Sequence, residues 1–400
     1  MLDTPEMKTP FGNFALQRFP SSSNHSGRQE PLRAWDAADE YLLQWVDEHT
    51  NEMTARPKTL ILNDSFGALG VALGHLPRHW QSDSFMAHQG CEQNLALNNS
   101  QESDATAAID ILDSLSWPTE AVDLVLIKVP KTSALLEHQL YHLRDLIHPQ
   151  TQIIAAGMVK HIHTNTLKTF EKVLGTTTTS LAKKKARLIF CQADRDRWTD
   201  QSPYPSRYRL KESDLPDTQR RALDFVIHNH ANVFSRASLD IGTRLFLQHL
   251  PTDKGAEDII DLGCGNGLLG IAAAQSHPQA RVHFVDESFM AIDSAKLNAS
   301  LALSSLDQCE FIAGNSLSSF ASDSADLVLN NPPFHQQSVV GDHIAWQMFV
   351  DSKRALRTGG SLWVIGNRHL NYHTKLKRLF GNCKTVASDR KFVVLQAQKR

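Results

Sequence analysis

Four consecutive residues, Asn331-Pro332-Pro333-Phe334, carry groups that could hold a planar amine. They follow an apolar segment over 325–330 that predicts a buried parallel strand. Because proline cannot donate to a sheet ladder, the strand must end there, at the edge where open α/β sheets bind ligands. The Asn331 carboxamide oxygen and the Pro332 carbonyl could each accept an N–H of an NH2 group, and Phe334 could stack on the attached ring. A Pro-Pro pair after a strand is also an ordinary stop signal, so this turn alone leaves both interpretations open.

A glycine-rich loop lies upstream of this turn. Residues 257–274 predict a strand, a loop and a helix, with Gly263, Gly265 and Gly267 in the loop. Glycines let the backbone turn sharply and approach a ligand, and the following helix offers N–H groups at its N-terminus. The next predicted strand ends at Asp286, roughly 20 residues past the loop, where a doubly wound fold places the acid that binds ribose hydroxyls.

The loop does not have dinucleotide-binding spacing, because its third glycine comes one residue early and an acid, Asp261, precedes the first. It resembles the cofactor loop of the class I methyltransferases that use S-adenosylmethionine (AdoMet). With the Asn-Pro-Pro-Phe turn after the fourth strand, it resembles the branch that methylates exocyclic amines of nucleobases or glutamine amides. The resemblance implies that the loop glycines, Asp261 and Asp286 bind AdoMet. Related enzymes often have an acid for the adenine amine where this chain has Asn315, whose amide oxygen could do the same.

The chain also repeats itself. Residues 61–72 align with 261–272 without a gap, and 123–126 are identical to 326–329. The identical positions of the first block are Leu62, Gly67, Leu69, Gly70 and Ala72. A repeat of this length indicates a duplicated domain and not a solenoid.

The two copies differ where the chemistry is expected. Asn63 and Ser65 replace two loop glycines, and Ser82 falls near the position of Asp286. The catalytic turn becomes Lys128-Val129-Pro130-Lys131. These changes predict a first copy that keeps the fold and has lost the cofactor and catalysis. Lys128 and Lys131 would suit phosphates, but they could equally be ordinary surface lysines.

We therefore expect an α/β chain of two tandem Rossmann-like methyltransferase domains, each with a seven-stranded, mostly parallel sheet. Residues 1–30 read as a polar, loosely held lead-in, and 31–200 as the degenerate copy, which would bind RNA or act as a scaffold. A linker is expected over 201–224 and the catalytic domain over 225–400.

The duplicated architecture resembles the bacterial ribosomal RNA guanine-N2 methyltransferases over nearly the whole chain. The runs that carry this resemblance are residues 16–20, 126–132, 227–236 and 331–337. They are most similar to the members that act on the large-subunit 23S rRNA, free or partly assembled. The resemblance implies methylation of the exocyclic N2 of a guanosine, with Asn331, Pro332 and Phe334 as catalytic residues. Alternatives are a 16S rRNA enzyme, a methyltransferase of DNA amines or of protein glutamine, and a non-catalytic RNA-binding assembly factor.

The composition limits where the protein is expected to act and which partners it is expected to bind. The 400 residues are 41% hydrophobic and 21% charged, as in an ordinary globular protein, without an apolar run long enough for a bilayer. The five scattered cysteines have no metal-ligand spacing, which predicts a cytoplasmic protein with free thiols, no metal and no membrane partner. Net charge is −2, so RNA binding requires local concentration of basic residues. The candidates are Lys183, Lys184, Lys185 and Arg187, and a C-terminal set of Lys375, Lys377, Arg378, Lys384, Arg390, Lys391, Lys399 and Arg400.

Overall fold

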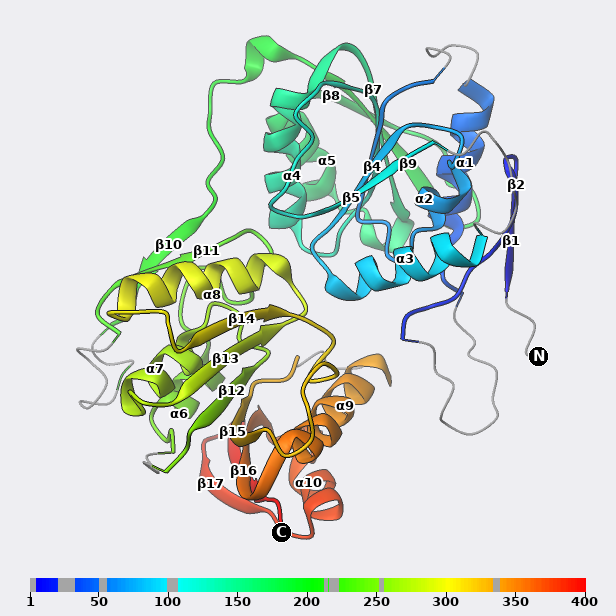
Figure 1. The fold of residues 1–400 in the computed structure, drawn as a ribbon. Coiled ribbons are helices and arrows are strands. Elements are labelled where there is room, and N and C mark those ends of the chain that lie inside the picture. Colours follow the sequence, from blue (N-terminus) through cyan, green and yellow to red (C-terminus); the bar gives the residue numbers. More distant parts are fainter. Residues whose placement is uncertain are drawn as a thin grey trace. The chain divides into compact units, whose positions relative to one another are not determined.

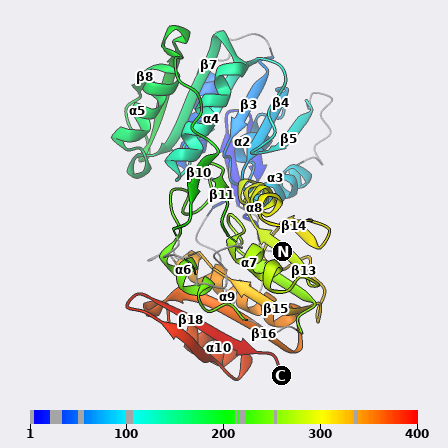
Figure 2. The same cartoon turned by 90° about the vertical axis from the view of Figure 1, so that its left-hand side faces the viewer.

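The chain forms two compact units, Met1–Pro203 (the leading unit) and Tyr204–Arg400 (the second unit), drawn in Figures 1 and 2. The computed structural model describes residues 5–20, 33–49, 56–98, 107–211, 215, 223–251, 255–333 and 339–400, with residues 339–342 as backbone only. Each unit contains one seven-stranded sheet and one two-stranded hairpin sheet. None of the helices in these ranges is long and apolar enough to cross a membrane.

The second unit has the strand order β14-β13-β12-β15-β16-β18-β17, in which only β18 runs antiparallel to its neighbours. Its elements are β10 (Ser206–Arg209), β11 (Val226–Asn229), α6 (Ile241–Leu247), β12 (Asp258–Leu262), α7 (Leu268–Ser276), β13 (Arg281–Asp286), α8 (Phe289–Ala302), β14 (Cys309–Ala313), β15 (Ala325–Asn330), α9 (Val339–Ala355), β16 (Leu356–Asn367), α10 (Tyr372–Phe380), β17 (Lys384–Ser388) and β18 (Phe392–Gln398).

The leading unit repeats this order strand for strand, as β5-β4-β3-β6-β7-β9-β8. Its elements are β1 (Glu6–Thr9), β2 (Gly12–Ala15), α1 (Ala37–His49), β3 (Thr59–Leu62), α2 (Ala68–Ala72), β4 (Arg78–Ser82), α3 (Phe85–Asn98), β5 (Ile109–Asp113), β6 (Val122–Lys128), α4 (Ser133–Leu146), β7 (Ile147–Met158), η2 (Val159–His161), α5 (Thr164–Val173), β8 (Gly175–Thr179) and β9 (Ala186–Ala193). The expected pair of doubly wound α/β domains is confirmed.

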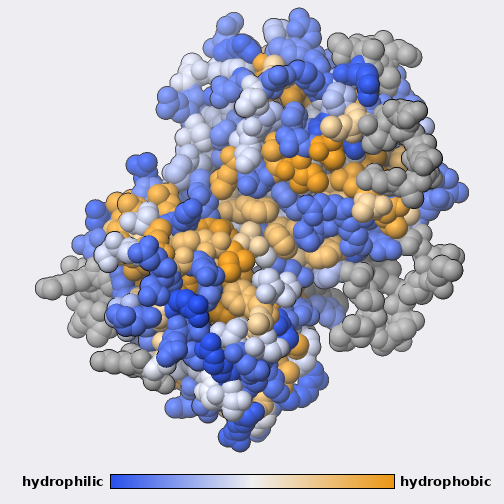
Figure 3. Space-filling view, viewed as in Figure 1, coloured by the Kyte–Doolittle hydropathy of each residue, from blue (hydrophilic) through white to orange (hydrophobic). Residues whose placement is uncertain are grey.

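Helices cover both faces of each sheet, so the central strands are buried and mostly apolar. In the second unit β12 is buried at every position, with Ile259 packed among α6 and α7 and Ile260 among α9 and α10. The outer helix α10 buries Tyr372, Leu376 and Phe380 and leaves its basic face outside. The surface over α10 and β17 is accordingly mostly hydrophilic in Figure 3.

One polar anchor occurs in both units. The Asn298 side chain accepts from the His228 amide (2.8 Å) and donates to the His228 carbonyl (2.9 Å), and also donates to the loop before α7. Asn94 makes the same set of bonds to Gln17 (2.8 and 2.9 Å) and to the loop before α2. Each asparagine thus joins a helix and the loop before the preceding helix to the hairpin sheet. Asn298 bonds within the second hairpin strand, β11, and Asn94 bonds just after β2, so β1–β2 and β10–β11 lie at similar positions in the two units.

Two expected boundaries are wrong for the same reason. The lead-in over 1–30 is not loosely held where the structure describes it, because β1 and β2 pair and bury Met7 and Leu16 in the core. The linker over 201–224 contains β10, which pairs with β11 inside the second unit. Short strands with few apolar residues give a weak sequence signal, and tertiary contacts decide their structure.

Candidate functional site

The glycine loop and the Asn-Pro-Pro turn meet at the carboxyl edge of the second sheet. They follow the neighbouring strands β12 and β15, at the point where the strand order reverses. The Asn331 backbone N–H donates to the Leu262 carbonyl (3.3 Å). An ideal Cβ on Gly263 would lie 3.0 Å from the Asn331 carbonyl oxygen and 3.4 Å from Met348. A side chain at 263 would therefore push the turn away, and glycine allows the two segments to touch.

The apex of the loop is open. Gly265 has a left-handed backbone (φ +53°), and a Cβ added there would meet no atom within 4 Å among the described residues. Gly267 is also left-handed (φ +83°), but a Cβ there would strike Ala295 at 2.9 Å, so it serves packing. The Gly265 amide donates to Asp286 Oδ2 (2.9 Å). The apex thus presents bare backbone beside a carboxylate.

The two acids expected at the cofactor occupy different environments. Asp286 is half-buried at the end of β13, and its second oxygen accepts from the Ser288 amide (3.1 Å). Asp261 is fully buried beneath the loop, where Oδ2 accepts from the Gly270 amide (2.8 Å) of α7. Burial, aided by the nearby charge of Asp286, raises the pKa of Asp261 to about 7, although the hydrogen bond from Gly270 opposes the shift. Asp261 supports the loop, and direct contact with a ligand stays a prediction.

The Asn331 side chain is held at one end and unpaired at the other. Its Nδ2 donates to the Thr243 hydroxyl (3.3 Å), which in turn donates to Asp240 Oδ2 (3.4 Å). Because Thr243 uses its proton on Asp240, it can only accept from Asn331, and this fixes the amide orientation. Asn331 Oδ1 is buried with no hydrogen-bond partner in the described part of the chain. This oxygen can therefore accept a hydrogen bond from a bound ligand.

The other expected site residues are placed as follows. Pro332 is buried beside Asn331, and Phe334 lies outside the described residues. The Gly314 amide donates to the Asp286 carbonyl (2.9 Å), so Asn315, half-buried, follows directly beside the end of β13. The structure therefore brings the loop, Asp286, Asn315 and Asn331 to one edge of the sheet.

Other chemistry is poorly supported. The Cys264 thiol in the loop is buried, which raises its pKa well above the usual value and keeps it protonated, so it is a poor nucleophile. The described residues contain no group of three or more His, Cys, Asp or Glu side chains that could hold a metal ion. His230 instead pairs with Asp293 (2.8 Å).

Thr243 is the contact that the sequence did not reveal. The spacing of Asp240 and Thr243 is typical of a helix start, and the Asp240 side chain accepts from the Thr243 backbone amide (2.9 Å) at the start of α6. Nothing in that signal points to Asn331, which lies 88 residues later.

In the leading unit, the space equivalent to this site is filled by the chain's own side chains. Asn63, at the position of Gly263, keeps the left-handed backbone (φ +64°). Its Nδ2 donates to the Lys128 carbonyl (3.0 Å), the counterpart of the Asn331 carbonyl, and to Gln139 Oε1 (2.9 Å). Protein hydrogen bonds thus fill the place where the second unit has only the backbone of Gly263.

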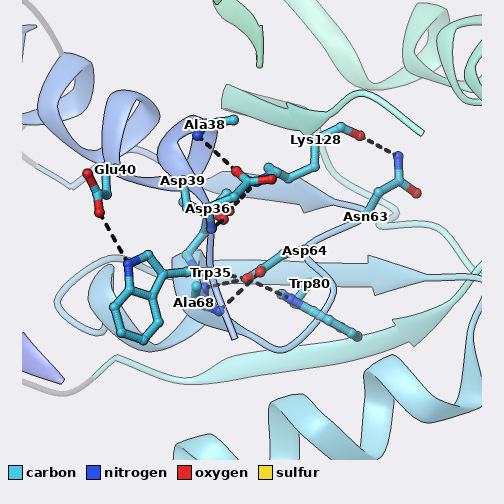
Figure 4. A network of polar contacts seen from close by, with 12 residues as sticks. Trp35, Asp36, Ala38, Asp39, Glu40, Asn63, Asp64, Ala68, Trp80 and Lys128 are labelled. Carbon is cyan, nitrogen blue, oxygen red and sulfur yellow. Dashed lines mark hydrogen bonds and ion pairs between the residues drawn. The ribbon is translucent and has the colours of Figure 1, made fainter. Parts of the chain in front are cut away.

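A buried carboxylate occupies the helix N-terminus of the leading unit. Asp64, at the position of Cys264, is almost fully buried, and burial raises its pKa. It accepts from the amides of Ala68 (3.0 Å), Leu69 (2.9 Å) and Gly70 (3.1 Å) and from Trp80 Nε1 (3.2 Å), as Figure 4 shows in part. In the second unit the structure records no side-chain acceptor for the amides of Leu268 and Leu269 among the described residues. In the leading unit, a ligand would have to compete with Asp64 for the amides at the start of the helix. In the second unit no such side chain competes among the described residues.

Lys128 is not an ordinary surface lysine, and its charge is already paired within the leading unit. Its side chain is only 13% exposed and forms ion pairs with Asp36 (2.8 Å) and Asp39 (2.7 Å), drawn in Figure 4. Burial raises the pKa of Asp39 to about 6 even though Lys128 opposes the shift. Lys131, three residues later, is exposed. Both expectations for Lys128 are therefore wrong, because its charge is used inside the unit.

Comparisons with known proteins agree with this division. Residues 4–195 match the family model of the RLMG N-terminal domain, and 224–396 match the methyltransferase small domain. Ribosomal RNA large subunit methyltransferase G of Erwinia tasmaniensis is 51% identical over 388 residues, which are 96% of each chain. The protein of that name from Streptomyces avermitilis is 47% identical over 395 residues, 98% of this chain and 99% of the relative.

The chain belongs to the ribosomal RNA large subunit methyltransferase G family. It is a methyltransferase. The solved structure of the T. thermophilus 16S rRNA N2 methyltransferase RsmC, in complex with AdoMet and guanosine, is similar over 99% of this chain and 98% of that chain, with a TM-score of 0.68. At 18% identity this likeness shows the two-domain fold. This chain thus shares its fold with that structure over nearly its whole length.

Lys128→Met should destabilise the protein by about 3–5 kcal/mol, because it leaves the buried Asp39 without its cation. Denaturant unfolding of the full chain measures the loss. The matched control is Lys131→Met, an exposed lysine of the same turn, whose effect should stay within about 0.5 kcal/mol. Equal effects of the two variants would contradict the buried ion pair.

Thr243→Val should lower kcat for methyl transfer about tenfold, because Asn331 loses the acceptor that orients its amide. Both Val and Ser at 243 keep the backbone amide that Asp240 caps, so α6 should begin normally in each. Thr243→Ser restores the hydroxyl and should recover most of kcat. If serine fails to rescue, or valine has wild-type kcat, Thr243 does not position Asn331.

Proposed function

We propose that this chain transfers the methyl group of AdoMet to the exocyclic N2 of a guanosine in 23S rRNA. The observation that carries the proposal is the buried, unpaired Oδ1 of Asn331, whose amide is held by Thr243 against the glycine loop. A buried acceptor without a partner is costly, and an incoming N–H group would satisfy it.

The residues of the loop fit AdoMet. The open space above Gly265 accepts a ligand without displacing protein atoms, and Asp286 offers a carboxylate beside it for ribose hydroxyls. Asn315, next to Asp286, would meet the adenine amine, while Asp261 keeps the loop and α7 together from below. When bound, AdoMet supplies an electrophilic methyl group on a sulfonium.

The turn after β15 would position the amine. Asn331 Oδ1 and the Pro332 carbonyl would accept the two N2 hydrogens, and Phe334 would stack on the base, which must leave its helix to reach the pocket. Guanine N2 is a weak nucleophile because its lone pair is conjugated with the ring. Orientation and close approach are therefore the main contribution of these residues. No general base is needed before transfer, because the methylated nitrogen is strongly acidic.

The leading unit would hold RNA or brace the second unit without taking up AdoMet. Asn63 and Asp64 fill its loop, and Lys128 closes its turn through Asp36 and Asp39. These bonds satisfy internally the groups that a cofactor would need. The relatives' name, with its large subunit, favours 23S rRNA as the substrate.

Asn331→Ala should lower kcat at least 100-fold while the AdoMet Kd changes by less than about threefold, because only the amine loses its acceptor. Mass analysis of 23S rRNA nucleosides and calorimetry with AdoMet measure the two effects. Asn330→Ala, which removes the neighbouring buried amide, is the matched control and should retain transfer. Near-normal turnover in Asn331→Ala would rule out the positioning role.

Gly265→Ala should weaken AdoMet binding at least tenfold, because the new methyl group enters the open space above the loop. Gly381→Ala is the control, since Gly381 also has a left-handed backbone (φ +78°) with nothing within 4 Å of an added Cβ among the described residues. Each substitution should cost about 1–2 kcal/mol of stability through backbone strain. Unchanged AdoMet affinity in Gly265→Ala would place the cofactor elsewhere.

A further inference from the structure

Asn367 is a second buried amide close to Asn331. It ends β16, the strand next to β15 in the sheet (Figure 2). Its side chain is only 4% exposed, and its Oδ1 has no hydrogen-bond partner among the residues that the structure describes. A buried acceptor without a partner costs free energy, so this oxygen points to a donor that a ligand would bring.

Asn367 faces the same side of the sheet as Asn331. Side chains alternate along a strand, so Asn331 continues the face of Leu329 and Asn367 continues that of Ile365. Leu329 and Ile365 pack in one apolar cluster with α6 and α7. The bond from Asn331 to Thr243 of α6 agrees with this placement. The two amides therefore lie at the carboxyl ends of neighbouring strands, on the face that α6 covers.

The register of the sheet sets the distance between the two amides. Asn330 is level with Val364, so Asn367 lies two residues further along its strand than Asn331 does. With strands about 4.8 Å apart and a rise of about 3.3 Å per residue, the two Cα atoms are about 8 Å apart. Two side chains at this spacing can converge on one planar base.

The turn after β16 does not need the Asn367 side chain. Asn367 is at the N-cap of the short helix η6 (Arg368–Leu370), where asparagine commonly accepts from a helix amide, yet it makes no such bond. The first amide of η6, that of Arg368, donates instead to the Lys391 carbonyl (3.0 Å). The backbone turn thus forms without the carboxamide group.

The leading unit has an apolar side chain at the equivalent position. Met158 ends β7 and precedes η2, just as Asn367 ends β16 and precedes η6. The backbones are the same, with φ −65° and ψ 138° at Met158 and φ −66° and ψ 137° at Asn367. Met158 packs against the core of its unit. This backbone thus accepts an apolar residue, and the unit with the open cofactor loop carries the amide instead.

We propose that Asn367 recognises the edge of the guanine base next to its N2 amine. This inference rests on the proposed function and adds the residue that selects guanine. Asn367 Oδ1 would accept the N1–H and its Nδ2 would donate to O6, while Asn331 holds the amine. A carboxamide offers an acceptor and a donor side by side, which matches guanine and mismatches adenine, where the two groups are reversed.

The test uses 2-aminopurine, which keeps the N2 amine but lacks both N1–H and O6. The guanosine that the full-length wild-type protein methylates is first mapped by mass analysis of 23S rRNA. A fragment that contains it is then made with either guanosine or 2-aminopurine at that position. The measured quantity is the ratio of kcat/KM for the two RNAs, because a general loss of activity cancels in this ratio.

In Asn367→Leu the preference for guanosine should fall at least tenfold from the wild-type value, while the AdoMet Kd stays within about threefold, because only the contact to the base edge is lost. Asn367→Met places the residue of the leading unit on the same backbone and should give the same fall.

Asn330→Leu is the matched control. The Asn330 amide is also buried and has no hydrogen-bond partner in the described ranges, but it continues the face of Val328, which packs with α9. This variant should keep the wild-type preference for guanosine.

A wild-type preference in both Asn367 variants would overturn the role of Asn367, whatever their overall rates. A fall of the same size in Asn330→Leu would also overturn it, since that amide faces away from the base. If the wild-type protein methylates no guanosine N2 of 23S rRNA, the proposed function itself fails. A mapped guanosine with an unchanged preference refutes only the assignment of Asn367.

Discussion

The close approach of two backbone segments at the carboxyl edge of the sheet controls what each unit can do. In the second unit Gly263 leaves the Asn331 carbonyl only 3.0 Å from where a Cβ would stand. The loop and the turn can therefore form two walls of one site. In the leading unit a side chain, Asn63, stands at that place and bonds the Lys128 carbonyl. One substitution at this contact fills the site with protein hydrogen bonds.

The same contact also explains why the two units use acids at different positions to bind the helix N-terminus. The amide of Gly70 or Gly270, in the first turn of the helix after the loop, needs an acceptor in a buried place. The second unit supplies it from the strand, with Asp261, and keeps the loop free of carboxylate side chains. The leading unit supplies it from the loop, with Asp64, which also takes two further amides. The N-terminal amide of the helix therefore has an acceptor in both units, but only the arrangement in the second unit leaves room for a ligand.

The local sequence pattern was enough to predict which strands and loops form the candidate site. Strands that end in glycine or proline, and a repeat with 200-residue spacing, specify both sheets and the positions of Gly263, Asp286 and Asn331. Contacts between distant residues were not predictable in this way. Thr243 reaches Asn331 across 88 residues, and Lys128 reaches Asp36 across 92. The hairpin that buries Met7 was missed because its alternation spans only a few residues.

Lys128 and Lys131 show why residue type alone could not assign their roles. They lie three residues apart in one turn, yet the first ends β6 and points toward α1, where it pairs with the buried Asp39 and the half-exposed Asp36. The second follows a proline and stays in water with no recorded acid partner among the described residues. A buried pair contributes little net attraction to outside phosphates, because its field is cancelled within a few ångströms. An exposed, unpaired lysine keeps its field, so a chain whose net charge is negative can attract an anion only through such local groups.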